Sequence, residues 1–143
     1  MIILSRKASF SAAHCLANPE FDHAKNLQLF GDCSNPSGHG HNYSIEVKVA
    51  GVPDRDTGFV ADLSKLKTVI HEIIVKKCDH KNLNTQVDFL KGVIPTVENL
   101  AEKFYEQLLP EIKKITRAGL YSVMVKETEN NYAEYRSKIE SCF

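Results

Sequence analysis

The chain has 143 residues, of which 43% are hydrophobic and 25% are charged, the balance of an ordinary globular protein. This length predicts one domain spanning residues 1–143, large enough to bury a hydrophobic core. Lysine and arginine together number 18, as do aspartate and glutamate, so the net charge is zero. The composition therefore gives no long-range electrostatic reason to expect nucleic acid or an anionic membrane as a partner.

The predicted elements begin with a strand from Ile2 to about His14, whose alternate side chains Leu4, Ala8, Phe10 and Ala12 are apolar. The start of the chain has too short an apolar run for a signal-peptide core, and no later run is long enough to span a membrane. The four cysteines form no Cys-x-x-Cys pair, and we expect free thiols in a reducing compartment. These features predict a cytoplasmic protein. The cysteines are Cys15, Cys33, Cys78 and Cys142.

One strand and two helices are predicted between residues 43 and 110. After a long loop, residues 43–49 alternate between apolar and polar side chains, which predicts a half-buried strand. Residues 63–78 carry apolar side chains at helical spacing after Asp62, a suitable N-cap. A second helix is predicted to begin after Thr96, again as the N-cap, and to end at Pro110.

The last predicted element is a hairpin, in which residues 120–127 alternate, residues 128–131 turn and residues 132–139 return. The order strand, loop, strand, two helices and hairpin predicts an α+β fold, a small antiparallel sheet covered by helices on one face. Such a sheet has two open edges and one uncovered face. Oligomerisation is one way to protect them.

Candidate functional side chains extend the apolar faces of these strands. His14 follows Phe10 and Ala12 in phase, and the face that contains Tyr43 reaches back to His41 and His39. On the last long strand, the apolar face is Tyr121, Val123 and Val125, and Glu127 continues it. A polar group without a partner is costly on a buried face, so these four groups are predicted to meet a ligand or one another.

Three histidines with one open coordination position are typical of catalytic zinc. The His-x-His spacing of His39 and His41 is a weak signal alone, and two solvated loop histidines are the competing interpretation. The in-phase His14 favours a metal site. Glu127 is either salt-bridged or a ligand anchor. His23 and His71 have no such context and are interpreted as structural or exposed.

Cys33 and the adjacent pair Asp79–His80 are the other reactive candidates. Cys33 alone is more often a small buried hydrophobe than a base, although a nearby zinc lowers the pKa of a thiol. Asp79 and His80 follow a helix, where a solvated turn is the simpler interpretation, but an Asp–His pair also suits proton transfer. The pattern around Ser9 resembles a phosphorylation site, a weak signal in a strand that we expect to be poorly accessible.

Six motifs resemble those of the 6-pyruvoyl-tetrahydropterin synthases and occur in the same order. They span nearly the whole chain, so chance is a poor explanation. They are SFSAAH (9–14), CSNPSGHGHNY (33–43), DTGFVADL (56–63), DHKNLN (79–84), PTVENLA (95–101) and KETENN (126–131).

The resemblance implies the tunnelling fold, a four-stranded antiparallel sheet with two helices on one face. It further implies that three sheets join into a barrel and that two trimers stack into a homohexamer with active sites between subunits. The site residues that it implies are zinc ligands His14, His39 and His41, general base Cys33, proton-transfer partners Asp79 and His80, pterin anchor Glu127, also a candidate for the proton relay, and Thr96 near the pterin pocket.

The implied reaction is that of a carbon–oxygen lyase in tetrahydrobiopterin biosynthesis. It converts 7,8-dihydroneopterin triphosphate to 6-pyruvoyl-tetrahydropterin and releases triphosphate, without an external redox cofactor. Zinc is expected to act as Lewis acid and template. The chain departs from the family pattern at Cys15, where a basic residue is common, so another cation such as Lys25 is needed if that residue holds triphosphate. It also departs at Val97, where many animal members have threonine.

Three alternatives remain open. One is 6-carboxy-tetrahydropterin synthase of the queuosine pathway, in which the cysteine usually lies nearer the His-Gly-His motif. Five residues separate Cys33 from His39 here, which favours the pyruvoyl enzyme. A relative with glutamate in place of the cysteine is disfavoured by Cys33 itself. The third is a non-catalytic zinc-binding assembly module, which needs the histidines but not the other candidates.

Overall fold

The computed structural model describes residues 1–137, arranged as one open sheet with helices. The predicted return of the last hairpin beyond residue 137 lies outside the described residues, as does Cys142. The strands are β1 (Ile2–His14), β2 (His39–Gly51), β3 (Lys81–Asn82), β4 (Gly119–Lys126) and β5 (Tyr132–Tyr135). The helices are α1 (His23–Phe30), α2 (Leu63–Ile70), α3 (Lys76–Cys78) and α4 (Val97–Ile115), with a π-helical turn, His71–Val75, joining α2 to α3.

The sheet has the strand order β3-β1-β2-β4-β5. Strands β1, β2, β4 and β5 are antiparallel neighbours, as predicted, and the long β1–β2 ladder ends with His14 opposite His39. The resemblance implied four strands, and the fifth is the short β3, which pairs in parallel with Ala12 and Ala13. It forms because the backbone amide of Leu83 donates to Ala13 O (2.8 Å), while the Asn84 side chain bonds both backbone groups of Cys15.

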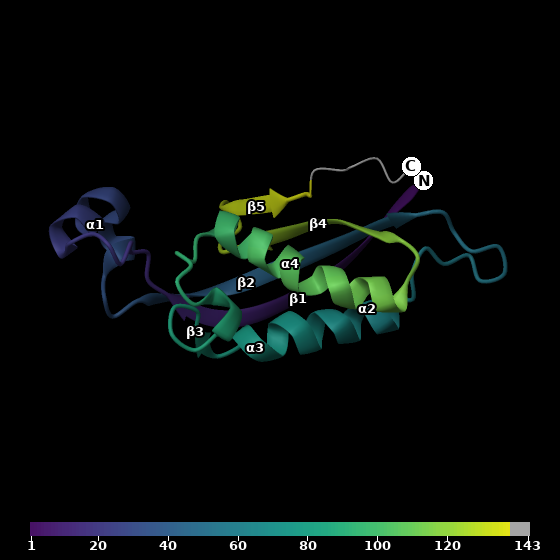
Figure 1. Cartoon of the computed structure of the whole chain (residues 1–143), viewed down its shortest axis with the longest axis horizontal. Helices are drawn as coiled ribbons and strands as arrows, with labels where there is room; N and C mark the ends of the chain where they lie inside the picture. The colour runs from purple at the N-terminus through teal and green to yellow at the C-terminus, as the bar shows by residue number, and fades with distance from the viewer. Residues whose placement is uncertain (138–143) are drawn as a thin grey trace.

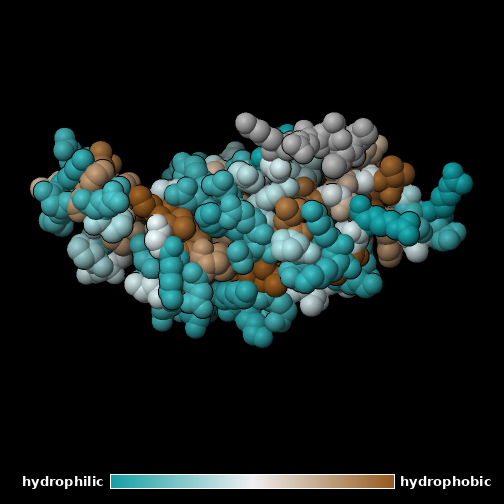
Figure 2. Space-filling view, in the orientation of Figure 1, coloured by the Kyte–Doolittle hydropathy of each residue, from teal (hydrophilic) through white to brown (hydrophobic). Residues whose placement is uncertain are grey.

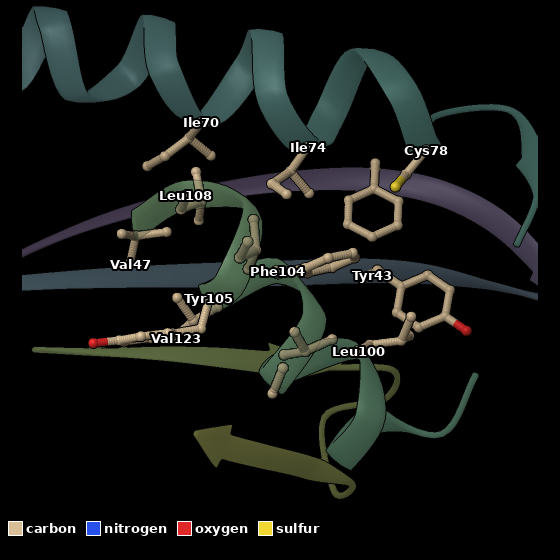
Figure 3. Close-up of a cluster of buried hydrophobic side chains, with 14 of the residues drawn as sticks. Tyr43, Val47, Ile70, Ile74, Cys78, Leu100, Phe104, Tyr105, Leu108 and Val123 are labelled. Atoms are coloured by element: carbon tan, nitrogen blue, oxygen red, sulfur yellow. The ribbon is translucent and has the colours of Figure 1, made fainter. Parts of the chain in front are cut away.

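The helices α2, α3 and α4 cover one face of the sheet (Figure 1). The predicted caps are present, because the Asp62 carboxylate accepts from the Ser64 and Lys65 amides and Thr96 Oγ1 accepts from the Asn99 amide. Apolar side chains from the helices and from the strands meet between the two layers (Figure 3). This layer of buried side chains is the core on which the site is built.

Two predictions about the helices were wrong. The loop after β1 contains α1, and Asp22 is the N-cap of this helix. The Asn26 side-chain amide donates to the Asn18 and Phe21 carbonyls and so holds α1 to the preceding loop. Helix α4 also continues through Pro110 to Ile115. Proline removes one backbone hydrogen bond, but fully buried Ile112 extends the apolar face of the helix beyond it.

Part of the predicted apolar face of β4 was wrong, because this strand contains a β-bulge. Ser122 pairs with Lys48, whereas Val49 pairs with Leu120, so Tyr121 is the extra residue. Leu120 therefore takes the buried position, and the Tyr121 ring lies 4.9 Å from the guanidinium carbon of Arg136. Beyond the bulge the predicted phase holds, because Val123 and Val125 are fully buried.

Two further features concern the surface. Ser9 is exposed in β1 rather than poorly accessible. Helix α1 lies apart from the other helices (Figure 1) and exposes Leu27 and Leu29. Hydrophobic residues gather where this helix joins the rest of the molecule (Figure 2).

Within residues 1–137, no helix combines the length and the apolar character that a membrane crossing requires.

Candidate active site

The register of β1 and β2 places three imidazoles on the face of the sheet that the helices cover. His39 is opposite His14, and His41 is opposite buried Ala12, so all three share the phase of Phe10 and Tyr43. The structure thus brings together the three histidines that the strand phases indicated.

One potential ligand atom from each of the three histidines lies within 4.8 Å of the other two, an arrangement that could hold a metal ion. The Nε2 atoms of His14 and His39 are 3.1 Å apart. Two nitrogens bound to one tetrahedral ion at about 2.0–2.1 Å are separated by ~3.3 Å. The donor set therefore fits a tetrahedral metal, with one coordination position left for a substrate.

A backbone carbonyl orients the most buried of these rings. His14 is 1% exposed, and its Nδ1 lies 2.8 Å from Pro95 O, so the N–H is on Nδ1 and the lone pair is on Nε2, the atom that faces His39. Burial lowers the pKa of His14, and burial also lowers the pKa of His41. Both effects favour the neutral imidazole that binds metal.

The loop that follows Asn35 enters β2 through Gly38, and this glycine is required by the geometry. Its φ is +73°, and a Cβ there would lie 3.0 Å from His14 O. The loop therefore presses directly against the end of β1. This close approach places His39 beside His14 at the first position of the ladder.

Glu127 follows β4 and lies beside the histidines. Its Oε2 is 4.0 Å from His14 Nε2 and 3.9 Å from His41 Nε2. It borders a pocket of about 410 Å³ together with Thr96, Asn131 and Tyr132. The N-cap of α4 and the acid at the end of β4 thus face one space, next to the Pro95 carbonyl that holds His14.

Cys33 lies in a 3₁₀ turn, Gly31–Ser34, alongside the end of β1. The Leu16 amide donates to Cys33 O (2.8 Å), and the thiol is half-buried. The other described cysteines are poor candidates for thiolate chemistry, because burial raises the pKa of Cys15 and raises that of fully buried Cys78 to about 12.

Asp79 and His80 form a separate pair at the β3 edge of the sheet. Asp79 Oδ1 accepts from the Ser11 amide (2.9 Å), and His80 Nδ1 lies 2.9 Å from Asp79 Oδ2. The Ser11 amide and then His80 lower the pKa of Asp79. The His80 side chain is 83% exposed. The His80 backbone has a φ of +58°, in the left-handed region that non-glycine residues seldom adopt.

The structure does not join this pair to Cys33 within the chain. Among the described residues, no hydrogen bond or ion pair links Cys33 to Asp79 or His80. His80 instead borders a groove of about 520 Å³ that is also lined by Ser11, Asn42 and His41. Lys25, the suggested triphosphate cation, lies on α1 with its Nζ 3.6 Å from the centre of the Phe21 ring.

Sequence reasoning missed three contributors to the site. The Pro95 carbonyl accepts the hydrogen bond of His14. The Asn84 side chain bonds the backbone of Cys15, the residue that follows His14, and so holds β3 beside the end of β1. Tyr43 was assigned to the apolar face; its ring does pack against His41, but its hydroxyl is a buried polar group without a partner. The available signal for Tyr43 was its phase, since it directly continues the face of His39 and His41.

The chain matches the family model described as 6-pyruvoyl tetrahydropterin synthase over residues 3–138. It belongs to this family. A relative from Homo sapiens named 6-pyruvoyl tetrahydrobiopterin synthase is 42% identical over 94% of this chain and 91% of its own length. One of the same name from Dictyostelium discoideum is 38% identical, covering 96% of this chain and 97% of its own.

A solved structure of 6-pyruvoyl tetrahydropterin synthase from Caenorhabditis elegans has the same fold. Its TM-score is 0.86 at 38% identity, over 95% of each chain. A relative named 6-carboxy-5,6,7,8-tetrahydropterin synthase, from Bacillus subtilis, is 30% identical over 94% of this chain. The pyruvoyl-named relatives are thus the more similar, which agrees with the interval between Cys33 and His39.

Proposed function

We propose that this chain is a zinc-dependent 6-pyruvoyl-tetrahydropterin synthase that converts 7,8-dihydroneopterin triphosphate to 6-pyruvoyl-tetrahydropterin and releases triphosphate. The observation that carries the proposal is the convergence of His14, His39 and His41 beside Glu127, in a chain that matches this family along its length. A metal site next to a carboxylate can hold two parts of one substrate at once.

Zinc is the proposed metal because three neutral imidazoles with an open fourth position are a common catalytic donor set for it. When bound, it supplies Lewis acidity toward the hydroxyl oxygens of the substrate side chain. The Pro95 carbonyl fixes the tautomer of His14, and Gly38 fixes the approach of His39.

Glu127 is the proposed pterin anchor. A carboxylate can accept two parallel hydrogen bonds from a guanidine-like pterin edge, which orients the ring as well as binding it. The position of Glu127 in one pocket with Thr96 supports this role, because both contact the same space beside the histidines.

Cys33 is the proposed base, which takes a carbon-bound proton from the substrate as its thiolate. His80 is the proposed proton-transfer partner. Since its Nδ1 faces the Asp79 carboxylate, its Nε2 is presented outward to a proton acceptor or donor.

We further propose a homohexamer in which these groups meet across subunit boundaries. The exposed His80 ring, the absence of a link to Cys33 within the described residues, and the open sheet edges at β3 and β5 support it. Light scattering on the purified protein tests the subunit number.

A cytoplasmic location is proposed from the free thiols of Cys15, Cys33 and Cys78, which suit a reducing compartment.

The test of this function is Cys33→Ala. The variant is expected to keep its zinc and its oligomeric state and to release triphosphate at less than about a hundredth of the wild-type rate, because the base is lost. Unchanged turnover would overturn the assignment of Cys33. A non-catalytic zinc module predicts no triphosphate release by the wild type either.

A further inference from the structure

The Tyr43 hydroxyl is a buried polar group that has no partner. Tyr43 is 0% exposed, and among residues 1–137 its oxygen is the one buried side-chain nitrogen or oxygen atom without a hydrogen bond. Leaving such a group unpaired costs about 1–3 kcal/mol, and folded proteins satisfy nearly all of them. The hydroxyl therefore indicates an interaction that forms in another state of the protein.

The ring that carries this hydroxyl is held on several sides. It stacks on Phe10 at 5.1 Å with an interplanar angle of 13°, and it meets His14 and His41 edge-on at 5.9 and 5.5 Å. Figure 3 shows it beside Leu100, near the start of α4. Because the ring is fixed by these contacts, a partner has to move to the hydroxyl.

Glu127 is the acceptor in position to do so. Its carboxylate lies within 4.0 Å of the same two imidazoles against which the Tyr43 ring packs. A neutral phenol donates through its O–H group and a carboxylate only accepts, so the two groups are complementary.

We propose that Tyr43 is a positioning residue, whose hydroxyl donates a hydrogen bond to the Glu127 carboxylate when pterin is bound. A carboxylate has about four lone-pair sites, so it accepts from Tyr43 and from two pterin N–H groups at the same time. The contact fixes the rotation of the carboxylate and aligns it with the pterin edge. This inference rests on the proposed function, in which Glu127 anchors the pterin.

The test is Tyr43→Phe in the zinc-loaded full chain, which removes only the hydroxyl. The dissociation constant for 7,8-dihydroneopterin, measured by fluorescence, is expected to rise about tenfold, and kcat/KM to fall by a similar factor. Zinc content is expected to stay at the wild-type value and the thermal midpoint to rise, because the variant removes a buried hydroxyl that has no partner in the free protein.

Tyr105→Phe is the matched control. Its hydroxyl is also buried, but it donates to Leu120 O at 3.0 Å, away from the histidines. This variant is expected to lower the thermal midpoint and to leave pterin binding unchanged, the reverse of the result for Tyr43. A merely structural role for Tyr43 predicts the same behaviour for both variants.

Glu127→Gln, alone and combined with Tyr43→Phe, shows whether the hydroxyl acts through the carboxylate. The Tyr43→Phe effect on pterin binding is expected to fall to less than twofold in the Glu127→Gln background. An undiminished effect there, or an effect below twofold in the wild-type background, overturns the proposal.

If the wild type binds the pterin without converting it, the proposed function fails, and the same binding cycle still tests the contact. Equal effects of Tyr43→Phe on pterin binding in the wild-type and Glu127→Gln backgrounds then overturn the contact. If the wild type does not bind the pterin at all, the proposed function and the contact are both overturned.

Discussion

The face of the sheet under the helices has two different regions. In its middle, Val47, Val123, Phe104 and Leu108 are fully buried, and the packing between the sheet and the helices is mainly apolar (Figure 3). At its end the same alternation continues with histidines and Glu127, whose ring nitrogens and oxygens face one another. One strand pattern can therefore build both a core and a reactive centre, depending on which atoms the alternating side chains carry.

The largest effect on zinc binding and on kcat/KM is expected from removing one histidine ligand. His39→Ala is expected to lose bound zinc and to lower kcat/KM at least a hundredfold, because two imidazoles hold the metal far less tightly than three. Metal analysis and triphosphate release measure these two effects. The control His71→Ala changes an exposed histidine on the π-helical turn and is expected to keep both at wild-type level.

Phe104→Ala tests the apolar region instead. Phe104 is fully buried and packs edge-on against Phe10 and Phe89, so the variant is expected to lose about 3–5 kcal/mol of unfolding free energy. Denaturant unfolding measures it. Phe59→Ala, at a site 58% exposed, is the control and is expected to change stability by less than about 0.5 kcal/mol. Equal losses in the two variants would contradict the assignment of the core.

Two glycines test how closely the loop must approach the end of β1. Gly38→Ala is expected to cost about 1–2 kcal/mol and to weaken zinc binding, since its φ is positive and the new Cβ meets His14 O at 3.0 Å. Gly40→Ala places its Cβ 3.6 Å from Ala12 O, an ordinary contact, and is expected to be tolerated. Calorimetry of zinc binding distinguishes them. If Gly38→Ala binds zinc as tightly as Gly40→Ala, the close approach is not needed.

The smallest expected effect lies on the other face, at Glu134 of β5. Its carboxylate accepts from Ser122 Oγ (2.6 Å) and Lys48 Nζ (2.9 Å), and these contacts lower its pKa. Glu134→Gln is expected to lose about 1 kcal/mol or less at pH 7. The lowered pKa means that this contribution is complete above the ordinary value of 4.5 and disappears as pH falls through the folded-state pKa.

Unfolding free energies of the two proteins at pH 7 and pH 3 measure this difference. Glu106→Gln, which changes a more exposed pair with Lys103, serves as the control. A difference that grows toward pH 3 would show that the Glu134 carboxylate does not stabilise the fold.

Strand phase was the most informative part of the sequence. The alternation from Phe10 to His14 and from Tyr43 back to His39 depends only on the period of a strand, so the meeting of the histidines followed from it. The bulge at Tyr121 shows the limit of this reasoning. An extra residue shifts the phase of everything on one side of it, and nothing in the local sequence marks its position.

The features that were missed depend on contacts distant in sequence. Strand β3 needs the bonds between Asn84 and Cys15, 69 residues apart, and His14 is oriented by Pro95, 81 residues away. For Pro110, a local signal was present, because Ile112 continues the apolar face of Leu108 one turn later. Burial of that face outweighed the lost backbone hydrogen bond.

The most direct test of the proposed function is the mass of the product. The zinc-loaded protein is incubated with 7,8-dihydroneopterin triphosphate, and the pterin and the released phosphate species are identified by mass spectrometry. The expected result is 6-pyruvoyl-tetrahydropterin together with intact triphosphate. A 6-carboxy-tetrahydropterin product, or unchanged substrate, would contradict the proposed function.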